Sequence, residues 1–462
     1  MKINPVLDQI DNDLPNALNR LLDLLKIESI STDPAYSKEC TKAADWLTND
    51  LRSIGFKADK RKTKGHPMVL AHGEGQGRRI LFYGHYDVQP VDPLELWHSP
   101  PFQPAVEHTS KGSVIRGRGT SDDKGQLMTF VEACRAWKTV HGCLPVKLSI
   151  FFEGEEESGS PSLIPFMKAN APELKSDITF ICDTGLYDSS TPGIVTSLRG
   201  TASIELEITG PSRDLHSGKY GGISVNPINI LTKILADLHD ETGKITLPNF
   251  YRGVADTSRT TKAQWKKLNF NHNDFLHEVG LSNPAGEVDR IPLEMIWARP
   301  TCDINGISGG YQGDGFKTII PAKASAKVSF RLVGNQNPKD IIESFKNHVK
   351  DYLPTDCSVR YLAEKGSKAT QMSLDHPVFE KAKTALSKEW PNPAAFIGSG
   401  GSIPIAGYFK EILDMDSLLI GFGKYDDQIH SPNEKYDLKS FHKGIRSWAR
   451  ILDELSSETY NK

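Results

Sequence analysis

The sequence predicts an α/β protein whose parallel or mixed sheet is covered by helices and interrupted by an inserted α+β unit. Short apolar segments of strand length alternate with helical patterns in the first part of the chain. A regular alternation of apolar and polar residues replaces this pattern in the middle third, and the first pattern returns towards the C-terminus. Alternating strands and helices are typical of sheets that carry helices on their faces.

The N-terminal region is predicted to be helical from residue 14 to residue 56. Apolar residues three or four apart form one stripe from Leu18 to Leu25 and another from Ala43 to Ile54. This spacing is that of a helix with one buried face. Gly55 follows the second stripe and supplies a C-terminal stop.

Three apolar segments then predict strands at residues 79–83, 147–152 and 178–182, with a helical stripe from Leu127 to Trp137 between the first two. The middle third differs, with two alternating strands and two helices expected at residues 202–208, 227–238, 324–332 and 338–352. After residue 372 the strand LLIGFG and a final helix resume the first pattern. We therefore expect one domain made of residues 1–198 and 373–462, with residues 199–372 inserted into it.

Composition limits the possible functions. A chain of 462 residues exceeds one ordinary hydrophobic core, so two or three compact units are expected. The net charge is −3 and no long basic run occurs, which argues against a nucleic-acid partner. We see no signal-peptide pattern and no apolar run of the roughly 20 residues that a membrane span needs. A cytoplasmic protein without a membrane partner is expected.

The six cysteines form no CxxC pair, and we interpret them as core or surface thiols. They are Cys40, Cys134, Cys143, Cys182, Cys302 and Cys357. Cys182 lies inside an apolar run and is expected in the core.

Residues that bind metals follow several of the predicted strands. His85 and Asp87 stand two apart at the end of the first strand, so their side chains can share one side, with Asp87 orienting the imidazole. Asp183 follows the third strand, and His430 follows LLIGFG. Reacting groups gather at the carboxyl ends of strands in open α/β sheets, so these residues can converge although they are distant in sequence. The alternative for His85 and Asp87 is a surface histidine followed by a turn aspartate.

Two acidic segments complete the set of candidates. Asp122 lies in GRGTSDDKG just before a helix, where an acidic residue can also serve as an N-terminal cap. The segment from Glu153 to Glu157 carries four carboxylates, which repel one another unless a cation or solvent compensates them. A solvated acidic loop is the alternative. Five oxygen and nitrogen ligands suggest a metallohydrolase.

These segments resemble, in order, the motifs of the dinuclear zinc peptidases, a group that includes carnosinases, nonspecific dipeptidases, aminoacylases and glutamate carboxypeptidases. The motifs are GHYDVQP, GRGTSDDKG, EGEEESGS, the context of Asp183, GPSRDLHSGKYGG, KTIIPAK with SFRLV, GGSIP and DDQIHSPNE. The resemblance runs from about residue 20 to 455 and is greatest to the dipeptidase branch. It implies a mixed-sheet catalytic domain with an inserted lid and dimerisation domain.

The resemblance also implies roles for particular residues. His85 and Asp183 would hold one metal, Glu157 and His430 the other, and Asp122 would bridge them. Glu156 would be the general base, and the peptide bond between Asp122 and Asp123 would be cis. The choice of base within Glu155 to Glu157 comes from the family, because the pattern leaves it open.

The residue types agree with such a pair of metals. Oxygen and nitrogen ligands without thiolates suit two divalent ions, with zinc the default for peptide hydrolysis and manganese or cobalt as alternatives. The carboxylates of Asp122, Glu157 and Asp183 with one hydroxide balance the charge of two divalent cations, so the site can be buried.

The expected substrate is a small peptide with a free C-terminal carboxylate. Arg331 in the strand SFRLV is our candidate for binding that carboxylate, and a structural ion pair is the alternative. The resemblance adds Thr318, Gly401 and Ser402 as substrate contacts. It further implies that His216, otherwise a loop histidine, stabilises the tetrahedral intermediate in a partner subunit, which makes a homodimer through the lid domain part of the mechanism.

Dipeptide hydrolysis is thus the leading interpretation. An N-acyl amino acid amidohydrolase or a carboxypeptidase on the same scaffold is the nearest alternative, and a non-catalytic metal-binding scaffold is a further one. Two departures from the family pattern, Gly398-Ser399 ahead of GGS and Glu364-Lys365-Gly366, count against carnosine-type specificity.

Overall fold

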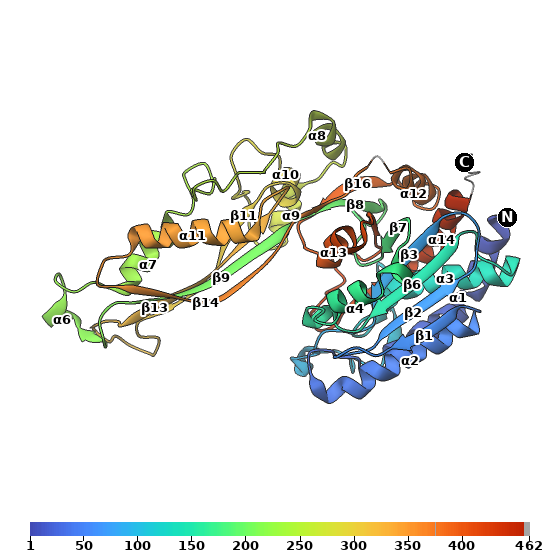
Figure 1. Ribbon diagram of the computed structural model, residues 1–462, viewed down its shortest axis with the longest axis horizontal. Coiled ribbons are helices and arrows are strands. Elements are labelled where there is room, and N and C mark those ends of the chain that lie inside the picture. Colours follow the sequence, from blue (N-terminus) through green and yellow to red (C-terminus); the bar gives the residue numbers. More distant parts are fainter. Residues whose placement is uncertain (375, 457–462) are drawn as a thin grey trace. The chain divides into compact units, whose positions relative to one another are not determined.

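The computed structural model describes residues 1–374 and 376–456, and Figure 1 labels its helices and strands. The chain folds into two compact units. The first comprises residues 1–196, 372–397 and 408–462, and the second comprises residues 197–371 and 398–407. The first unit is therefore built from both ends of the chain.

A mixed sheet forms the centre of the first unit, in the order β1-β2-β6-β3-β7-β17-β8, with β16 paired to β8. β3 runs parallel to β6 and β7, and β17 runs parallel to β7, whereas the outer strands are antiparallel. The strands are β1 (Lys57–Arg61), β2 (Met68–Gly73), β3 (Arg79–His85), β6 (Lys147–Glu153), β7 (Ile178–Ile181), β8 (Gly193–Leu198), β16 (Ala395–Ser399) and β17 (Ser417–Ile420). The predicted fold class is confirmed, and its strand predictions agree with β3, β6 and β7.

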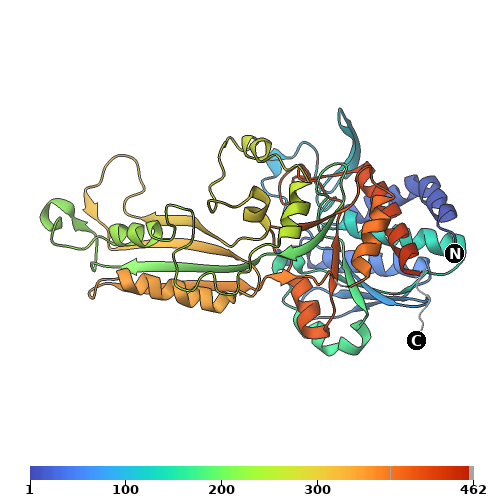
Figure 2. The same cartoon turned by 90° about the horizontal axis from the view of Figure 1, so that it is seen from above.

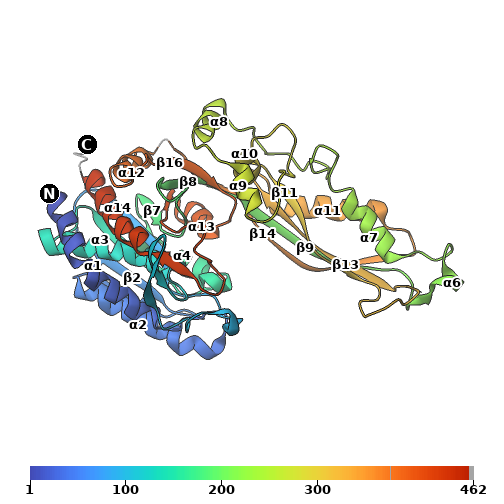
Figure 3. The same ribbon diagram turned by 180° about the vertical axis from the view of Figure 1, so that it is seen from behind.

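Helices cover this sheet, and α3 is buried along most of its length. Helices α1, α3 and α14 pack together, as Figure 3 shows, while α2 packs on β1 and β2. The helices of this part are α1 (Asn4–Leu25), α2 (Ser37–Ser53), α3 (Lys124–His141), α4 (Leu163–Ala169), α5 (Ala171–Leu174), α12 (Val378–Ser387), α13 (Pro404–Leu413) and α14 (Leu438–Ser456). A small sheet of β18 (Lys435–Asp437), β5 (Gly112–Arg116) and β4 (Ala105–Thr109) lies apart from the main one.

An aromatic cluster joins the central strand β3 to helices α3 and α14. Phe82 of β3 stacks on Phe130 of α3 with ring centroids 3.8 Å apart, and Trp448 of α14 meets both rings edge-on. All three side chains are fully buried. Burial of each such ring stabilises the fold by about 1.5–3 kcal/mol, so segments from both ends of the chain are fixed against β3.

The predicted N-terminal helix begins earlier than its apolar stripe suggested. α1 starts at Asn4, with Pro5 in the first turn, where a missing N–H costs nothing. Val6, Leu7 and Ile10 are buried, although the polar pair Asp8 and Gln9 between them weakens the apolar pattern of the sequence. The predicted helical region is two helices, and the second ends at Ser53, two residues before Gly55 with φ of +79°.

The second unit is an antiparallel sheet in the order β11-β13-β9-β14. Figure 2 shows its long strands lying side by side, and α7 and α11 cover one face. β9 alternates buried and half-buried residues along its whole length, as predicted. The strands are β9 (Gly200–Thr209), β11 (Thr301–Gly309), β13 (Lys323–Leu332) and β14 (Ser358–Ser367), and the covering helices are α7 (Pro227–Ala236) and α11 (Pro338–Tyr352).

Shorter elements complete this unit. β10 (Leu215–His216) pairs with β12 (Ile319–Ile320) close to α6 (Ser217–Tyr220). The remaining elements are α8 (Arg259–Lys266), α9 (His272–His277), α10 (Pro292–Trp297) and β15 (Thr370–Gln371). No helix among the described residues combines the length and the apolar character that crossing a membrane requires.

Candidate metal centre

Three of the five candidate ligands lie at or just beyond the carboxyl ends of the central parallel strands. His85 is the last residue of β3, Asp183 follows β7 by two residues, and Glu157 follows β6 in the 3₁₀ turn of residues 156–158. His430 lies in the loop between β17 and β18, with φ of +61°. Asp122 lies two residues before α3, as the sequence predicted, and the strand that precedes it, β5, belongs to the small sheet.

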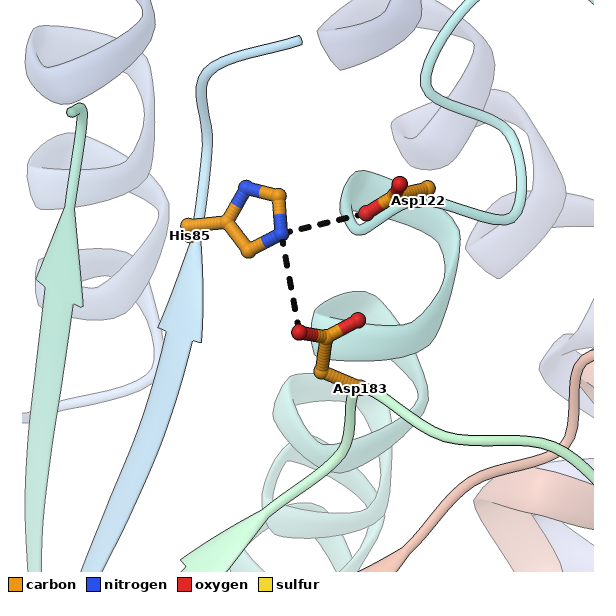
Figure 4. A group of neighbouring side chains, drawn as sticks. All are labelled: His85, Asp122 and Asp183. Atoms are coloured by element: carbon orange, nitrogen blue, oxygen red, sulfur yellow. Dashed lines mark ion pairs between the residues drawn. The ribbon is translucent and has the colours of Figure 1, made fainter. Parts of the chain in front are cut away.

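His85, Asp122 and Asp183 form one group of potential ligands, and Figure 4 shows the imidazole pointing towards both carboxylates. The Nε2 atom of His85 lies 3.1 Å from Oδ1 of Asp122 and 4.0 Å from Oδ2 of Asp183. The His85 ring is buried, and the two carboxylates are largely shielded from solvent.

Asp122, Glu157 and His430 form a second group. The Nε2 atom of His430 lies 2.9 Å from Oδ2 of Asp122 and 3.4 Å from Oε2 of Glu157. Asp122 thus belongs to both groups, with one carboxylate oxygen directed to each histidine. Its two oxygens could therefore bridge two cations.

Two buried atoms support the presence of metal at this place. His85 Nε2 and Glu157 Oε1 have no hydrogen-bond partner within the described part of the chain. Burial, followed by the charge of Asp122, raises the pKa of Asp183 well above its ordinary value. Buried carboxylates this close together are unfavourable unless cations compensate them, so the donor set fits divalent metal ions.

Asp87 contacts both His85 and the turn that carries Glu156 and Glu157. Its carbonyl oxygen lies 3.1 Å from Nδ1 of His85, and its carboxylate is 3.5 Å from the same nitrogen. The carboxylate accepts hydrogen bonds from the backbone N–H groups of Glu156 and Glu157 at 3.3 and 3.0 Å. The sequence predicted contact between Asp87 and His85 but gave no sign of this link to the glutamate turn.

The four glutamates at the end of β6 and in the turn after it have different surroundings. Glu153 accepts a hydrogen bond from Tyr83, and Glu155 accepts two from the backbone N–H groups of His66 and Ser162. Glu157 accepts one from Gln89 Nε2 at 2.6 Å and also reaches His430. Burial, opposed in part by His85, raises the pKa of Glu156 to about 7.

Glu434 is an important residue that the sequence analysis did not identify. This buried carboxylate accepts hydrogen bonds from Arg118 Nη1 at 2.8 Å and from the backbone N–H groups of Gly119, Ser121 and Asp122 at 2.9–3.1 Å. It therefore holds the loop that carries Asp122. The only signal was its place at the end of DDQIHSPNE. The peptide bond between Asp122 and Asp123 is cis, as the resemblance implied.

A third acidic group, formed by Asp426, Asp427 and Asp437, has a simpler explanation. Lys435 Nζ contacts all three carboxylates, and Lys424 Nζ contacts Asp437 at 3.0 Å. The two lysines compensate most of the negative charge of the three carboxylates, so ion pairs explain this group without a bound cation.

The predicted substrate contacts fall into two clusters of the second unit. In the first cluster, His216 is exposed, and its Nδ1 accepts a hydrogen bond from the backbone N–H of Gly218. The neighbouring residue Ser217 donates its backbone N–H to the carbonyl of Thr318, which brings Thr318 close to His216. Arg331 donates to Ser402 Oγ at 3.3 Å.

Gly401 belongs to the second cluster. Its N–H donates to Ser399 Oγ, and its carbonyl accepts from the backbone of Arg199. Arg199 is a further residue that the sequence analysis missed.

The fold and the ligand groups define a metal-dependent hydrolase of the α/β class. The chain belongs to the peptidase family M20/M25/M40, whose family model matches residues 81–454.

The relatives have several related activities. The chain is 31% identical to the Cys-Gly metallodipeptidase dug1 of Schizosaccharomyces pombe, over 99% of both chains. Among solved structures it is similar to human carnosine dipeptidase 1, with 25% identity over 99% of both chains and a TM-score of 0.82. It is also similar to the metallo-carboxypeptidase Sso-CP2 of Sulfolobus solfataricus, with 30% identity over 95% of this chain and 99% of that one, and a TM-score of 0.83.

Proposed function

We propose that this protein is a metallodipeptidase that hydrolyses the peptide bond of dipeptides or short peptides with a free C-terminal carboxylate. The observation that carries the proposal is the position of Asp122 between two groups of potential metal ligands, which it shares. The dipeptidases among its relatives support the substrate class.

In this proposal, His85 and Asp183 would hold one divalent ion, Glu157 and His430 the other, and Asp122 would bridge them. Zinc is the first expectation, and manganese or cobalt are alternatives with the same ligand types. Such ions, when bound, lower the pKa of water and polarise the carbonyl of the scissile bond.

Glu156 would move the proton. Its carboxylate would accept the proton of the attacking water and then donate it to the nitrogen of the departing amine. Burial raises the pKa of Glu156, and a raised pKa favours a carboxyl group that must both accept and release a proton. Asp87 would act as a positioning residue, since it binds the backbone of Glu156 and lies against His85.

Arg331, Gly401 and Ser402 would bind the substrate, with the guanidinium of Arg331 at the C-terminal carboxylate. His216 would stabilise the negative oxygen of the tetrahedral intermediate, and Thr318 would lie near it. These roles follow from the family resemblance, and they require His216 to come from a second copy of the chain.

The dimensions of β13 support that requirement. Lys323 at one end of β13 pairs with Thr209, near the cluster of His216 and Thr318, whereas Arg331 lies near the other end. Arg331 is eight positions along the strand from Lys323, which corresponds to about 26 Å at roughly 3.3 Å per residue. A dipeptide is only about 7 Å long, so the two clusters of one chain cannot contact the same dipeptide.

Exposed apolar side chains support a homodimer through the second unit. Several lie near the His216 end of the sheet: Tyr220, Ile223, Tyr311 and Phe316, of which Ile223 is 84% exposed and Phe316 is fully exposed. An apolar surface of this kind is typical of a protein interface.

A cytoplasmic location is part of the proposal. Free thiols at all six cysteines are compatible with it.

The substrate class is tested with a panel of dipeptides, longer peptides and N-acyl amino acids, assayed with added zinc or manganese. Rapid hydrolysis of dipeptides is expected. Turnover of acylated compounds alone would indicate an amidohydrolase, and preference for longer peptides would indicate a carboxypeptidase like Sso-CP2. A purified protein that holds less than about one metal ion per chain, and that shows no hydrolysis after zinc or manganese is added, would favour a non-catalytic scaffold.

The dimer is tested by mixing two inactive variants, Glu156→Ala and His216→Ala. Random reassembly gives mixed dimers in which one site has both residues, so roughly a quarter of the wild-type activity should return. If the mixture stays inactive while light scattering shows that the subunits exchange, His216 does not act across the dimer.

A further inference from the structure

Two arginine side chains lie in one hydrogen-bonded cluster of the second unit. Arg331 lies on β13 opposite Thr201 of β9, and Arg199 immediately precedes β9. Both residues are half-buried. Within the residues that the structure describes, neither guanidinium forms an ion pair with an aspartate or a glutamate.

The absence of a paired carboxylate leaves this cluster with excess positive charge. Burial and the charge of Arg331 lower the pKa of Arg199 to about 10, and Asp303 acts in the opposite direction. Asp303 is exposed, and its carboxylate accepts a hydrogen bond from Thr301. Two like charges in a partly desolvated place are unfavourable, and a ligand carboxylate would compensate them.

Arg199 also holds the loop that connects β16 to α13. Its Nε donates to the carbonyl of Gly400 at 3.0 Å, and its backbone N–H donates to the carbonyl of Gly401 at 3.1 Å. The hydroxyl of Ser402 donates to the carbonyl of Arg199. A Cβ atom at position 400 would lie 3.0 Å from Nη2 of Arg199, so the loop passes close to the guanidinium.

Ser402 joins the two arginines. Its single hydrogen is donated to the carbonyl of Arg199, so in this arrangement the hydroxyl can contact a substrate only as an acceptor. Its oxygen accepts a hydrogen bond from Nη1 of Arg331 at 3.3 Å. The hydroxyl therefore orients the guanidinium of Arg331 relative to the backbone of Arg199.

We propose that Arg199 and Arg331 together bind the free carboxylate of the substrate, and that Arg199 positions Arg331 through Ser402. The inference rests on the proposed dipeptidase function and adds a second guanidinium to its substrate site. Arginine presents a planar fork of N–H donors that matches a carboxylate, which makes this pair selective for a charged C-terminus.

The test compares Arg199→Met and Arg199→Lys with the wild type, and uses Arg360→Gln as a matched control. Arg360 is an exposed arginine on β14, at the edge of the same sheet. The substrates are Ala-Leu and its C-terminal amide, and inhibition by free leucine is measured alongside. Metal content and thermal unfolding show whether each variant is folded.

Loss of a charge-assisted contact should raise KM for Ala-Leu and the inhibition constant of leucine about ten- to a hundredfold in Arg199→Met. Hydrolysis of the amide should change little, Arg199→Lys should recover part of the loss, and Arg360→Gln should match the wild type. Unchanged selectivity in Arg199→Met, or an equal loss of kcat for acid and amide, would overturn the proposal.

A separate binding measurement distinguishes failure of the arginine pair from failure of the proposed dipeptidase function. If the wild type hydrolyses no dipeptide, calorimetry still compares leucine binding by the wild type and Arg199→Met. Binding that is weakened in the variant supports the arginine pair as a carboxylate site, and equal or absent binding refutes it.

Discussion

Replacing Glu434 by glutamine should reduce both the stability of the fold and its affinity for metal. Each oxygen of Glu434 accepts two hydrogen bonds, one oxygen from Arg118 and Gly119 and the other from Ser121 and Asp122. Glutamine keeps one acceptor oxygen and places an NH₂ group against two donors. It also leaves the guanidinium of Arg118, which is only 1% exposed, without its counter-charge.

Breaking a buried ion pair by removing one partner costs about 3–5 kcal/mol, and we expect a loss of this size in the free energy of unfolding. Because the loop also carries Asp122, zinc affinity should fall about ten- to a hundredfold, as for other residues that orient a metal ligand. The double variant Arg118→Met/Glu434→Gln should lose less stability than the sum of the single variants, since no charge is then stranded.

The unfolding free energy is measured by urea denaturation of metal-free protein, followed by tryptophan fluorescence. Zinc affinity is measured by competition with a chromophoric chelator. Glu95→Gln, at an exposed position, makes the same chemical change without burial and serves as control. If Glu434→Gln unfolds within about 0.5 kcal/mol of the wild type and binds zinc equally well, then Glu434 does not hold the Asp122 loop.

Further predictions concern the metal, the base, the core and the pH dependence. His430→Ala should leave about one metal ion per chain whereas Asp122→Ala should lose both, as metal analysis by mass spectrometry would show; equal contents would contradict a bridging Asp122. Glu156→Gln should keep its metal and lose at least about a hundredfold in kcat, and a smaller loss would exclude it as the base. Phe130→Ala should destabilise by about 3–5 kcal/mol in urea denaturation, because it empties the stack on Phe82, and a loss below 1 kcal/mol would contradict that packing. Burial would raise the pKa of Glu389, but hydrogen bonds from Arg446 and Arg450 outweigh it and lower the pKa below the unfolded value of 4.5. Its stabilising effect is therefore present above pH 4.5 and is lost as the pH falls below it, so Glu389→Gln should destabilise at pH 7 and little at pH 3; the same loss at both values would refute this.

The sequence predicted the elements whose boundaries have local causes. The helix at residues 338–352 is bounded as expected because Pro338 occupies its first position and the side chain of Asn337 caps it. The strand around residues 202–208 was found because its alternation persists from end to end. The start of α1 was missed because polar residues interrupt its apolar stripe.

His85 and Asp183 could be found because each lies close to the end of a strand with a clear apolar pattern, whereas the choice among Glu155 to Glu157 came from the family resemblance. The partners of the candidate ligands could not be found, since they depend on contacts between distant segments. Glu434 lies more than 300 residues from the backbone that it binds, and only the folded chain shows that Glu155 is occupied by the N–H groups of His66 and Ser162. Arg199 was likewise invisible, because its importance comes from a loop about 200 residues away.

The origin of the candidate ligands from both ends of the chain has a consequence for biosynthesis. His85, Asp122, Glu157 and Asp183 leave the ribosome early, but His430 follows only after the whole inserted unit has been made. During that interval the nascent chain exposes clustered carboxylates and lacks α14, which covers Phe82 and Phe130. A premature stop codon before residue 430 would therefore yield an inactive product with an open core, which quality-control proteases would remove.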